Sequence, residues 1–405
     1  DMNSMFSYCS NLESLDLNNF DTSEVEDMGL MFKQCYKLKS VNLKSFNTRY
    51  VKNMGEMFYM CKELTSLDIT NFNTEYVENM KNMFDGCSQL SSLNLDNFRT
   101  SNVVNMQNMF NGCTNLKTLS LSNFDVNQVV LLDGMFGSCG SLTNLDLSSF
   151  RTSLVENMAN MFYNCGSLTS LNIQNFDFSR VTNMANMFNG CSSLVSLDTS
   201  NFYTQKVDRM DALFENCKKL TSINLSKFRT GDVTTMSDMF NGCSSLRSLD
   251  CTSFDTSKVT SMYQMFKDCS SLVSLDITSF NANNVLVTKA MFQNCISLRS
   301  LNLNYFSSQE IYSMEYMFNN CTSLVSLDLS GIRSNPRDMQ NLFQDCHSLE
   351  TLNVKNLLTD NALYSGHIFE NCYALKSLDL SSFTFIHTKN LDATFRNCRS
   401  LTSVN

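Results

Sequence analysis

Apolar residues recur along this chain with two alternating spacings. Leu15 and Leu17 are two residues apart, so in an extended segment both point to one face and their polar neighbours to the other. From Val25 onward the apolar spacing becomes three, three and one, which predicts one stripe of a short α- or 3₁₀-helix. Residues 21–23, which are Asp, Thr and Ser, lie between the two segments and are typical of a helix start. Each unit is therefore predicted to contain a short strand, a corner, a short helix and a second corner.

The unit repeats at a fixed period, which the cysteines mark most clearly. Sixteen of the seventeen cysteines lie 26 residues apart, with a single step of 25 between Cys321 and Cys346, and only Cys251 lies off this grid. A fixed period of this length marks a repeat architecture, in which each unit stacks on the last. The sequence therefore predicts an α/β solenoid of about 15–16 coils, with one short parallel strand and one short α- or 3₁₀-helix in each coil.

The unbroken period predicts one solenoid domain over residues 1–405, with no linker between globular domains. Neither end carries the polar cap that normally covers the last coil of a solenoid. We therefore expect these residues to be a segment of a longer protein. No apolar run approaches the roughly 20 residues that span a bilayer, so no direct membrane insertion is expected in this segment.

The consensus of the repeat is Met-Phe-x-x-Cys-x-x-Leu-x-x-Leu-x-Leu-x-x-Phe-x-Thr-x-x-Val-x-x-Met, and it is clearest in residues 57–84 and 239–266. This motif resembles the BspA-like branch of leucine-rich-repeat surface proteins, whose members are associated with cell surfaces, adhesion and host contact. The resemblance covers the whole chain. It implies a leucine-rich-repeat solenoid with a parallel sheet and an extracellular or cell-surface location. It carries over no ligand, because the shared residues are the buried ones.

The charge of the chain disfavours two classes of partner. There are 39 acidic and 30 basic residues, which give a net charge of −9, whereas nucleic acids and anionic membranes call for clustered Lys and Arg. No nucleic-acid partner is expected. A local exception in the second repeat is interpreted as a solvated charge cluster. It consists of Lys33, Lys37, Lys39, Lys44, Arg49 and Lys52.

The cysteines are predicted to be reduced and buried. Neighbouring positions of the ladder would lie about 4.8 Å apart with parallel Cβ vectors, whereas a disulfide needs converging Cβ atoms near 3.8 Å. A line of thiols also lacks the tetrahedral geometry that zinc prefers. His347, His367 and His387 occupy different positions within their repeats, so they form no ladder and no ligand pair. No metal and no cofactor is predicted.

Candidate contact residues lie on two parts of the repeat. The outward strand position is Asp or Asn in nearly every repeat, and its Asn amides can donate to neighbouring carboxylates, which is the structural interpretation. The functional interpretation is a polar strip that accepts a partner or a cation, with Asp146, Asp198, Asp250 and Asp276 as candidates. The competing site is a cluster of aromatic residues within one repeat, since Tyr is enriched at binding hot spots. This cluster consists of Tyr305, Tyr312 and Tyr316.

Two functions follow from the repeat. The favoured hypothesis is an extracellular or cell-surface protein that mediates adhesion or recognition of a protein or glycan on another surface. The alternative is a structural rod that forms a surface layer, fibre or filament by association with itself. An enzyme is not expected, because catalysis needs unlike groups that converge at one place and this pattern repeats the same groups along the chain.

Overall fold

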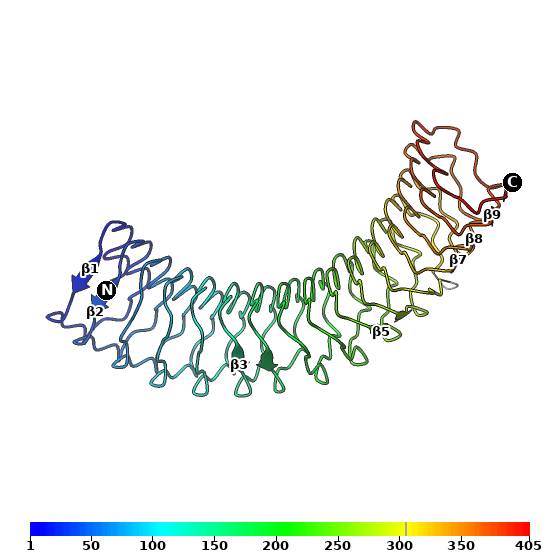
Figure 1. The fold of residues 1–405 in the computed structure, drawn as a ribbon. Helices are drawn as coiled ribbons and strands as arrows, with labels where there is room; N and C mark the ends of the chain where they lie inside the picture. Colours follow the sequence, from blue (N-terminus) through cyan, green and yellow to red (C-terminus); the bar gives the residue numbers. More distant parts are fainter. Residues whose placement is uncertain (304–305) are drawn as a thin grey trace. The chain divides into compact units, whose positions relative to one another are not determined.

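The chain folds into stacked coils. The computed structural model describes residues 1–303 and 306–405 (Figure 1). Contacts divide the chain into two compact units, Asp1–Tyr203 (unit 1) and Thr204–Asn405 (unit 2). Each unit is a stack of coils, and the continuity of the array across the whole chain stays a prediction.

Short parallel strands lie on one side of the coils. Unit 1 contains β1 (Ser14–Asp16), β2 (Ser40–Asn42), β3 (Asn144–Asp146) and β4 (Ser170–Asn172). Unit 2 contains β5 (Ser248–Asp250), β6 (Ser274–Asp276), β7 (Ser326–Asp328), β8 (Thr351–Asn353), β9 (Ser377–Leu378) and β10 (Ser403–Val404). The pairs are β1–β2, β3–β4, β5–β6, β7–β8 and β9–β10, and in each pair a residue lies beside its equivalent in the next coil. This confirms short parallel strands in the predicted register, but among the described residues only ten strands form, so not every coil contains the predicted strand.

The predicted helix is wrong. Residues 1–303 and 306–405 contain no helix. The segment from Met28 to Cys35 is instead a succession of turns, although Met28, Met31 and Phe32 are fully buried, as the apolar spacing predicted. Within the same ranges, no helix long and apolar enough to cross a membrane is present.

The hydrogen bonds of the turn segment explain this difference. The N–H groups of Leu30 and Phe32 each donate to a carbonyl of the next coil at 2.9 Å, whereas the N–H of Lys33 donates to the carbonyl of Leu30 at 3.0 Å and closes a turn. A helix would send every N–H to the residue four before it. Here every second N–H bonds to the neighbouring coil, so the segment is held by its stacking partner.

Left-handed residues make these turns possible. Leu30 and Gln34 have φ angles of 57° and 58°, and the equivalent positions in later coils are also left-handed. Asn, Asp and Gly tolerate this conformation best, and they frequently occupy the positions directly before Met and before Cys, as Asn82 and Gly86 do. This recurrence is the sequence signal that distinguishes the turns from a helix.

The threonine expected at a helix start has another role. Thr22 is buried, and its hydroxyl donates to the carbonyl of Asn47 at 2.9 Å and accepts the N–H of Asn47 at 2.8 Å. Thr48 repeats the arrangement with Asn73 at 2.8 and 2.7 Å. The buried hydroxyl is fully satisfied and joins two coils, which explains why a polar residue recurs at this inward position.

Ladders of identical side chains fill the core. The rings of the Met-Phe ladder stack closely, with centroids 5.7 Å apart for Phe84–Phe110 and 5.8 Å for Phe110–Phe136. In the corner ladder the separation is 6.2 Å for Phe98–Phe124. The corner rings are thus farther apart than the Met-Phe rings in this part of unit 1.

The cysteines form a ladder of free thiols. Fifteen of the seventeen are buried, whereas Cys9 is exposed and Cys398 is half-buried. Thiols of this ladder donate to a Phe carbonyl of the preceding coil; for Cys61 and Phe32 the distance is 3.2 Å. Burial raises the pKa of Cys165 to about 12, so the thiol stays protonated at neutral pH.

We expect Phe110→Ala to lower the free energy of unfolding by about 3–5 kcal/mol, because it removes a fully buried ring from the stacked ladder. Denaturant unfolding followed by circular dichroism measures the change. Val104→Ala is the matched control in the same coil, since Val104 is 46% exposed and should change stability by less than about 0.5 kcal/mol. An unfolding midpoint unaffected by Phe110→Ala would contradict the assignment of the inward face.

Thiol reagents should modify only Cys9, and more slowly Cys398, in the folded protein, because the other thiols are buried and protonated. All seventeen should react after denaturation. Mass spectrometry of the labelled peptides measures the pattern, and Cys9→Ser should remove the fast label. Fast labelling of several buried cysteines, or disulfides between neighbouring coils, would disprove the thiol ladder.

Candidate functional site

The four candidate aspartates are exposed at the edge of the strand side. Asp146, Asp250 and Asp276 are the last residues of β3, β5 and β6, and Asp198 occupies the equivalent position in its coil. Each carboxylate accepts the backbone N–H two residues later. For Asp146 and Asp250 this distance is 2.9 Å. The carboxylates therefore close the turn that follows the strand.

These hydrogen bonds favour the charged form of the carboxylates. The N–H of Ser148 holds the pKa of Asp146 below its usual value, and the hydroxyl and N–H of Thr252 do the same to the pKa of Asp250. The predicted amide donation also occurs, since Asn42 Nδ2 donates to Asp16 Oδ1 at 2.9 Å. This bond is the one that the structural interpretation expects, and it joins two neighbouring coils of the column.

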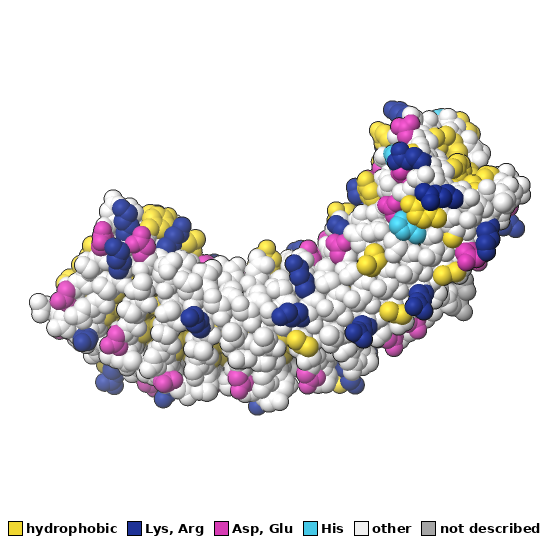
Figure 2. All heavy atoms as spheres, in the orientation of Figure 1, with side chains coloured by type: hydrophobic (Ala, Val, Ile, Leu, Met, Phe, Trp, Pro, Cys, Tyr) yellow, Lys and Arg dark blue, Asp and Glu magenta, His cyan; other side chains and the backbone are white. Residues whose placement is uncertain are grey.

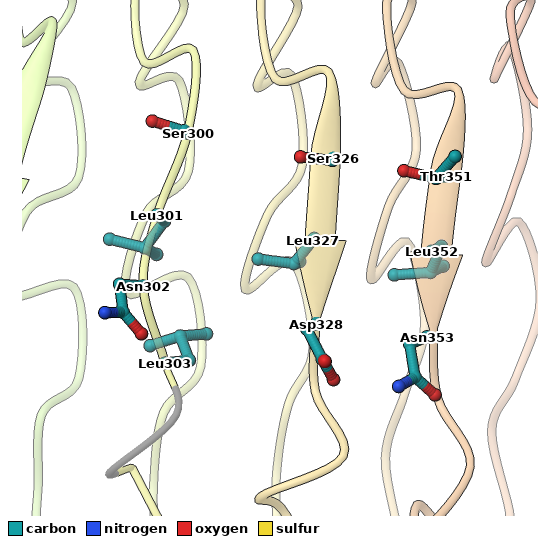
Figure 3. Close-up of a pocket in the computed structure, with 10 residues that line it drawn as sticks. All are labelled: Ser300, Leu301, Asn302, Leu303, Ser326, Leu327, Asp328, Thr351, Leu352 and Asn353. Carbon is teal, nitrogen blue, oxygen red and sulfur yellow. The ribbon is translucent and has the colours of Figure 1, made fainter.

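The strand side is hollowed, but its side chains are small. One hollow in unit 2 has a volume of about 520 Å³. Among its lining residues in Figure 3, Ser300, Ser326 and Thr351 form one row, and leucines and Asn or Asp form the rows below it. A second hollow of about 440 Å³ includes Asp250 and Asp276. Neither lining contains an aromatic or an arginine side chain, the types that dominate binding energy at protein interfaces.

The three candidate tyrosines do not form a described cluster. Tyr305 lies outside the described residues. Tyr316 is half-buried with a left-handed backbone at φ 57°, whereas Tyr312 is 53% exposed. Tyr312 lines a cavity.

This cavity lies where the repeat is irregular. Its volume is about 300 Å³, and we call it the Tyr312 trough. The lining residues are Tyr312, Asn335, Arg337, Asn361, Leu363 and His387. They come from consecutive coils of unit 2, next to the corner that is shortened in the 25-residue repeat. In unit 2, hydrophobic, basic and histidine side chains lie close together over the coils nearest the C-terminus (Figure 2).

Main-chain bonds hold one wall of the trough. The N–H of Arg337 donates to the carbonyl of Tyr312 at 2.9 Å, and the N–H of Leu363 donates to the carbonyl of Arg337 at 2.8 Å. On the opposite wall, the N–H of Asn361 donates to Asn335 Oδ1 at 2.9 Å. The side chains of the first wall therefore project from a fixed backbone row.

Tyr312 also orients the guanidinium group of Arg337 in the trough. Arg337 Nη1 donates to Tyr312 Oη at 3.0 Å, and the guanidinium carbon lies 5.9 Å from the centre of the ring. This arrangement combines a hydrogen bond with a cation–π contact. Sequence reasoning found Tyr312 but missed Arg337 and Leu363, and the 25-residue step was the signal that marked their place.

A second polar cluster, around Glu370, is satisfied within the fold. Glu370 is buried, and it accepts hydrogen bonds from Arg396 and Gln344 and lies 2.6 Å from His367 Nδ1. Burial alone would raise the pKa of Glu370, but these hydrogen-bond partners hold it below its usual value. Within residues 1–303 and 306–405, no group of three or more His, Cys, Asp or Glu side chains could hold a metal ion.

The basic cluster of the second repeat is partly neutralised. Lys33 pairs with Glu56 at 2.7 Å, and Lys39 pairs with Glu13 at 2.9 Å. Both pairs join neighbouring coils. Acidic side chains of neighbouring coils therefore balance two charges of the cluster.

A family model described as "Mycoplasma protein of unknown function, DUF285" matches residues 1–93, 85–196, 143–224, 208–331 and 288–404. The chain belongs to the DUF285 family. The family model matches in five overlapping stretches, and the stacked coils of this DUF285 protein agree with the repeat family inferred from the motif. No curated protein matches its sequence.

Among solved structures, the DUF285 protein is similar to a leucine-rich repeat protein from Bacteroides ovatus. The identity is 18%, the match covers 99% of this chain and 85% of the other, and the TM-score is 0.47. A leucine-rich cell surface protein from Faecalibacterium prausnitzii is 17% identical, with 67% and 81% of the chains covered and a TM-score of 0.35. A leucine-rich repeat protein from T. pallidum is 23% identical, with 50% and 74% covered and a TM-score of 0.26.

Replacing Asp146, Asp198 and Asp250 together by Asn should weaken the acid sensitivity of folding. The pKa values of these three carboxyl groups are lower in the folded protein than in the unfolded chain, where they are about 3.9. The ionised carboxylates therefore stabilise the fold at pH values above about 3.9. This stabilisation is lost as the pH falls through the lowered pKa values. The variant lacks these titrations, so its melting temperature should fall less steeply below about pH 4.

At neutral pH the same variant should keep its stability within about 0.5 kcal/mol. The Asn oxygen can accept the same N–H, as Asn224 does from Ser226 at 3.0 Å. Thermal unfolding measured from neutral to acidic pH tests both statements. An acid profile identical to that of the wild type would show that these hydrogen bonds do not stabilise the carboxylates.

Proposed function

We propose that this DUF285 protein is a non-enzymatic recognition solenoid of the cell surface, which binds a protein partner through the Tyr312 trough. The observation that carries the proposal is the convergence of unlike side chains from consecutive coils, an aromatic ring, a guanidinium and an aliphatic side chain, around one cavity. The cell-surface location is taken from the resemblance to the BspA-like proteins.

The composition of the trough supports protein binding. Tyr and Arg are the residue types most enriched at interface hot spots, and they act best when neighbouring groups exclude water. Leu363 and the ring of Tyr312 supply apolar area, and the two asparagines on the opposite wall supply hydrogen-bond donors and acceptors. The strand side offers small hydroxyl and carboxylate groups, so a contact there would be weaker.

Selection from a phage-displayed random peptide library on the immobilised protein tests this function. We expect the enriched peptides to lose about 2 kcal/mol or more of binding free energy with the double variant Tyr312→Ala and Leu363→Ser, because both anchors are removed. Surface plasmon resonance with synthetic peptides measures the loss.

Two kinds of control locate the site. Tyr50→Ala and Val273→Ser remove side chains that are 45% and 50% exposed elsewhere, and binding should be unchanged. The triple replacement of Asp146, Asp198 and Asp250 by Asn should also leave binding unchanged. Loss of binding in the triple variant alone would move the site to the strand side. Polymers in electron micrographs, with no peptide that depends on the trough, would favour the structural rod.

A further inference from the structure

The Tyr312 trough carries a positive charge that no acidic side chain balances. The chain has more acidic than basic residues, yet none of the six lining residues is acidic. Among the described residues, Arg337 takes part in no ion pair. The trough is therefore complementary to an anionic group.

The guanidinium of Arg337 is oriented but mostly unused. A guanidinium has five N–H donors, and in the described residues one side-chain bond, to Tyr312 Oη, is made. The ring of Tyr312 holds the group in place at 5.9 Å. A planar, fixed set of donors suits a carboxylate, which can accept two parallel hydrogen bonds from it.

The backbone of the trough favours a side-chain carboxylate over a chain terminus. Terminal carboxylates are commonly captured by nests of free backbone N–H groups. Here the N–H groups of Arg337, Leu363 and Asn361 are already used, and Pro336 has none. The N–H of Tyr312 is also used, by the carbonyl of Leu286, so most of the donors that remain belong to side chains.

We propose that the Tyr312 trough binds an extended acidic segment of a protein partner, with one Asp or Glu carboxylate on Arg337 and a nearby apolar side chain against Leu363. This inference rests on the proposed function and names the chemistry that the site selects. A cavity of about 300 Å³ is at the small end of ligand pockets, so it accepts one or two side chains and not a large ligand. Asn335 and Asn361 provide amide donors and acceptors for the backbone of the segment.

The experiment uses peptides from the phage selection, synthesised with blocked ends. Each is made in its selected form, with the acid replaced by its amide (Glu→Gln or Asp→Asn), and with the apolar neighbour replaced by Ser. Fluorescence anisotropy measures binding to the wild type, Arg337→Gln, Arg337→Lys and Arg299→Gln. Arg299 is an exposed arginine outside the trough and serves as the matched control.

In the wild type, replacing the acid by its amide should weaken binding about tenfold, as expected for a lost hydrogen bond to a charged group. Arg337→Gln should weaken the acidic peptide by a similar factor and remove the difference between acid and amide. Arg337→Lys should restore part of the preference, because it keeps the charge but not the paired donors. Arg299→Gln should bind like the wild type.

Several results would overturn the inference. One is a preference for the acidic peptide over its amide that persists in Arg337→Gln. Another is binding that requires a free C-terminal carboxylate. A third is stronger binding of an acidic polysaccharide such as polygalacturonate than of peptides. Peptides that need Tyr312 and Leu363 but no acid would leave the proposed function standing and reject the acidic ligand. If no peptide depends on the trough, both proposals fail.

Discussion

The fold depends on one pattern of hydrogen bonding, in which every second N–H of the Met-Phe turn segment donates to the next coil. The remaining N–H groups close turns within the coil, so no donor of this segment needs a helix. Because each coil depends on its neighbour, identical residues must lie at the same height in successive coils. The stacked phenylalanines, the thiol ladder and the buried threonines all follow from this requirement.

The sequence predicted which side chains face inward more reliably than it predicted the backbone. Met28, Met31 and Phe32 are buried as expected, because apolar spacing reports a face and not a conformation. The same spacing fits a helical stripe and a chain of turns. What separates them is the supply of hydrogen-bond partners from another coil, which a single repeat does not contain. Asn and Gly recur before Met and before Cys, and this recurrence indicates left-handed turns, since few other residues adopt a positive φ angle easily.

The candidate site was predicted only in part for a related reason. Asp146 and Asp250 were found because they belong to a column, but their carboxylates serve the turn that follows the strand. The trough lies on equivalent positions of successive coils whose residue types change from coil to coil, so no repeated residue type marks it. Tyr312 was identified by its residue type. Arg337 and Leu363 are recognised as parts of the site only when three coils are stacked on one another. The shortened repeat was visible in the sequence, but its effect on the surface was not.

The three coils that form one wall of the trough are joined by main-chain hydrogen bonds, from Arg337 to Tyr312 and from Leu363 to Arg337. These main-chain bonds do not depend on which side chain occupies each position. The residues that maintain the fold and the residues that determine binding specificity are therefore different in this protein. Exchange of a whole 26-residue unit between relatives would move a new set of outward side chains into an intact ladder, so recombination alone could generate a repertoire of surfaces on one scaffold.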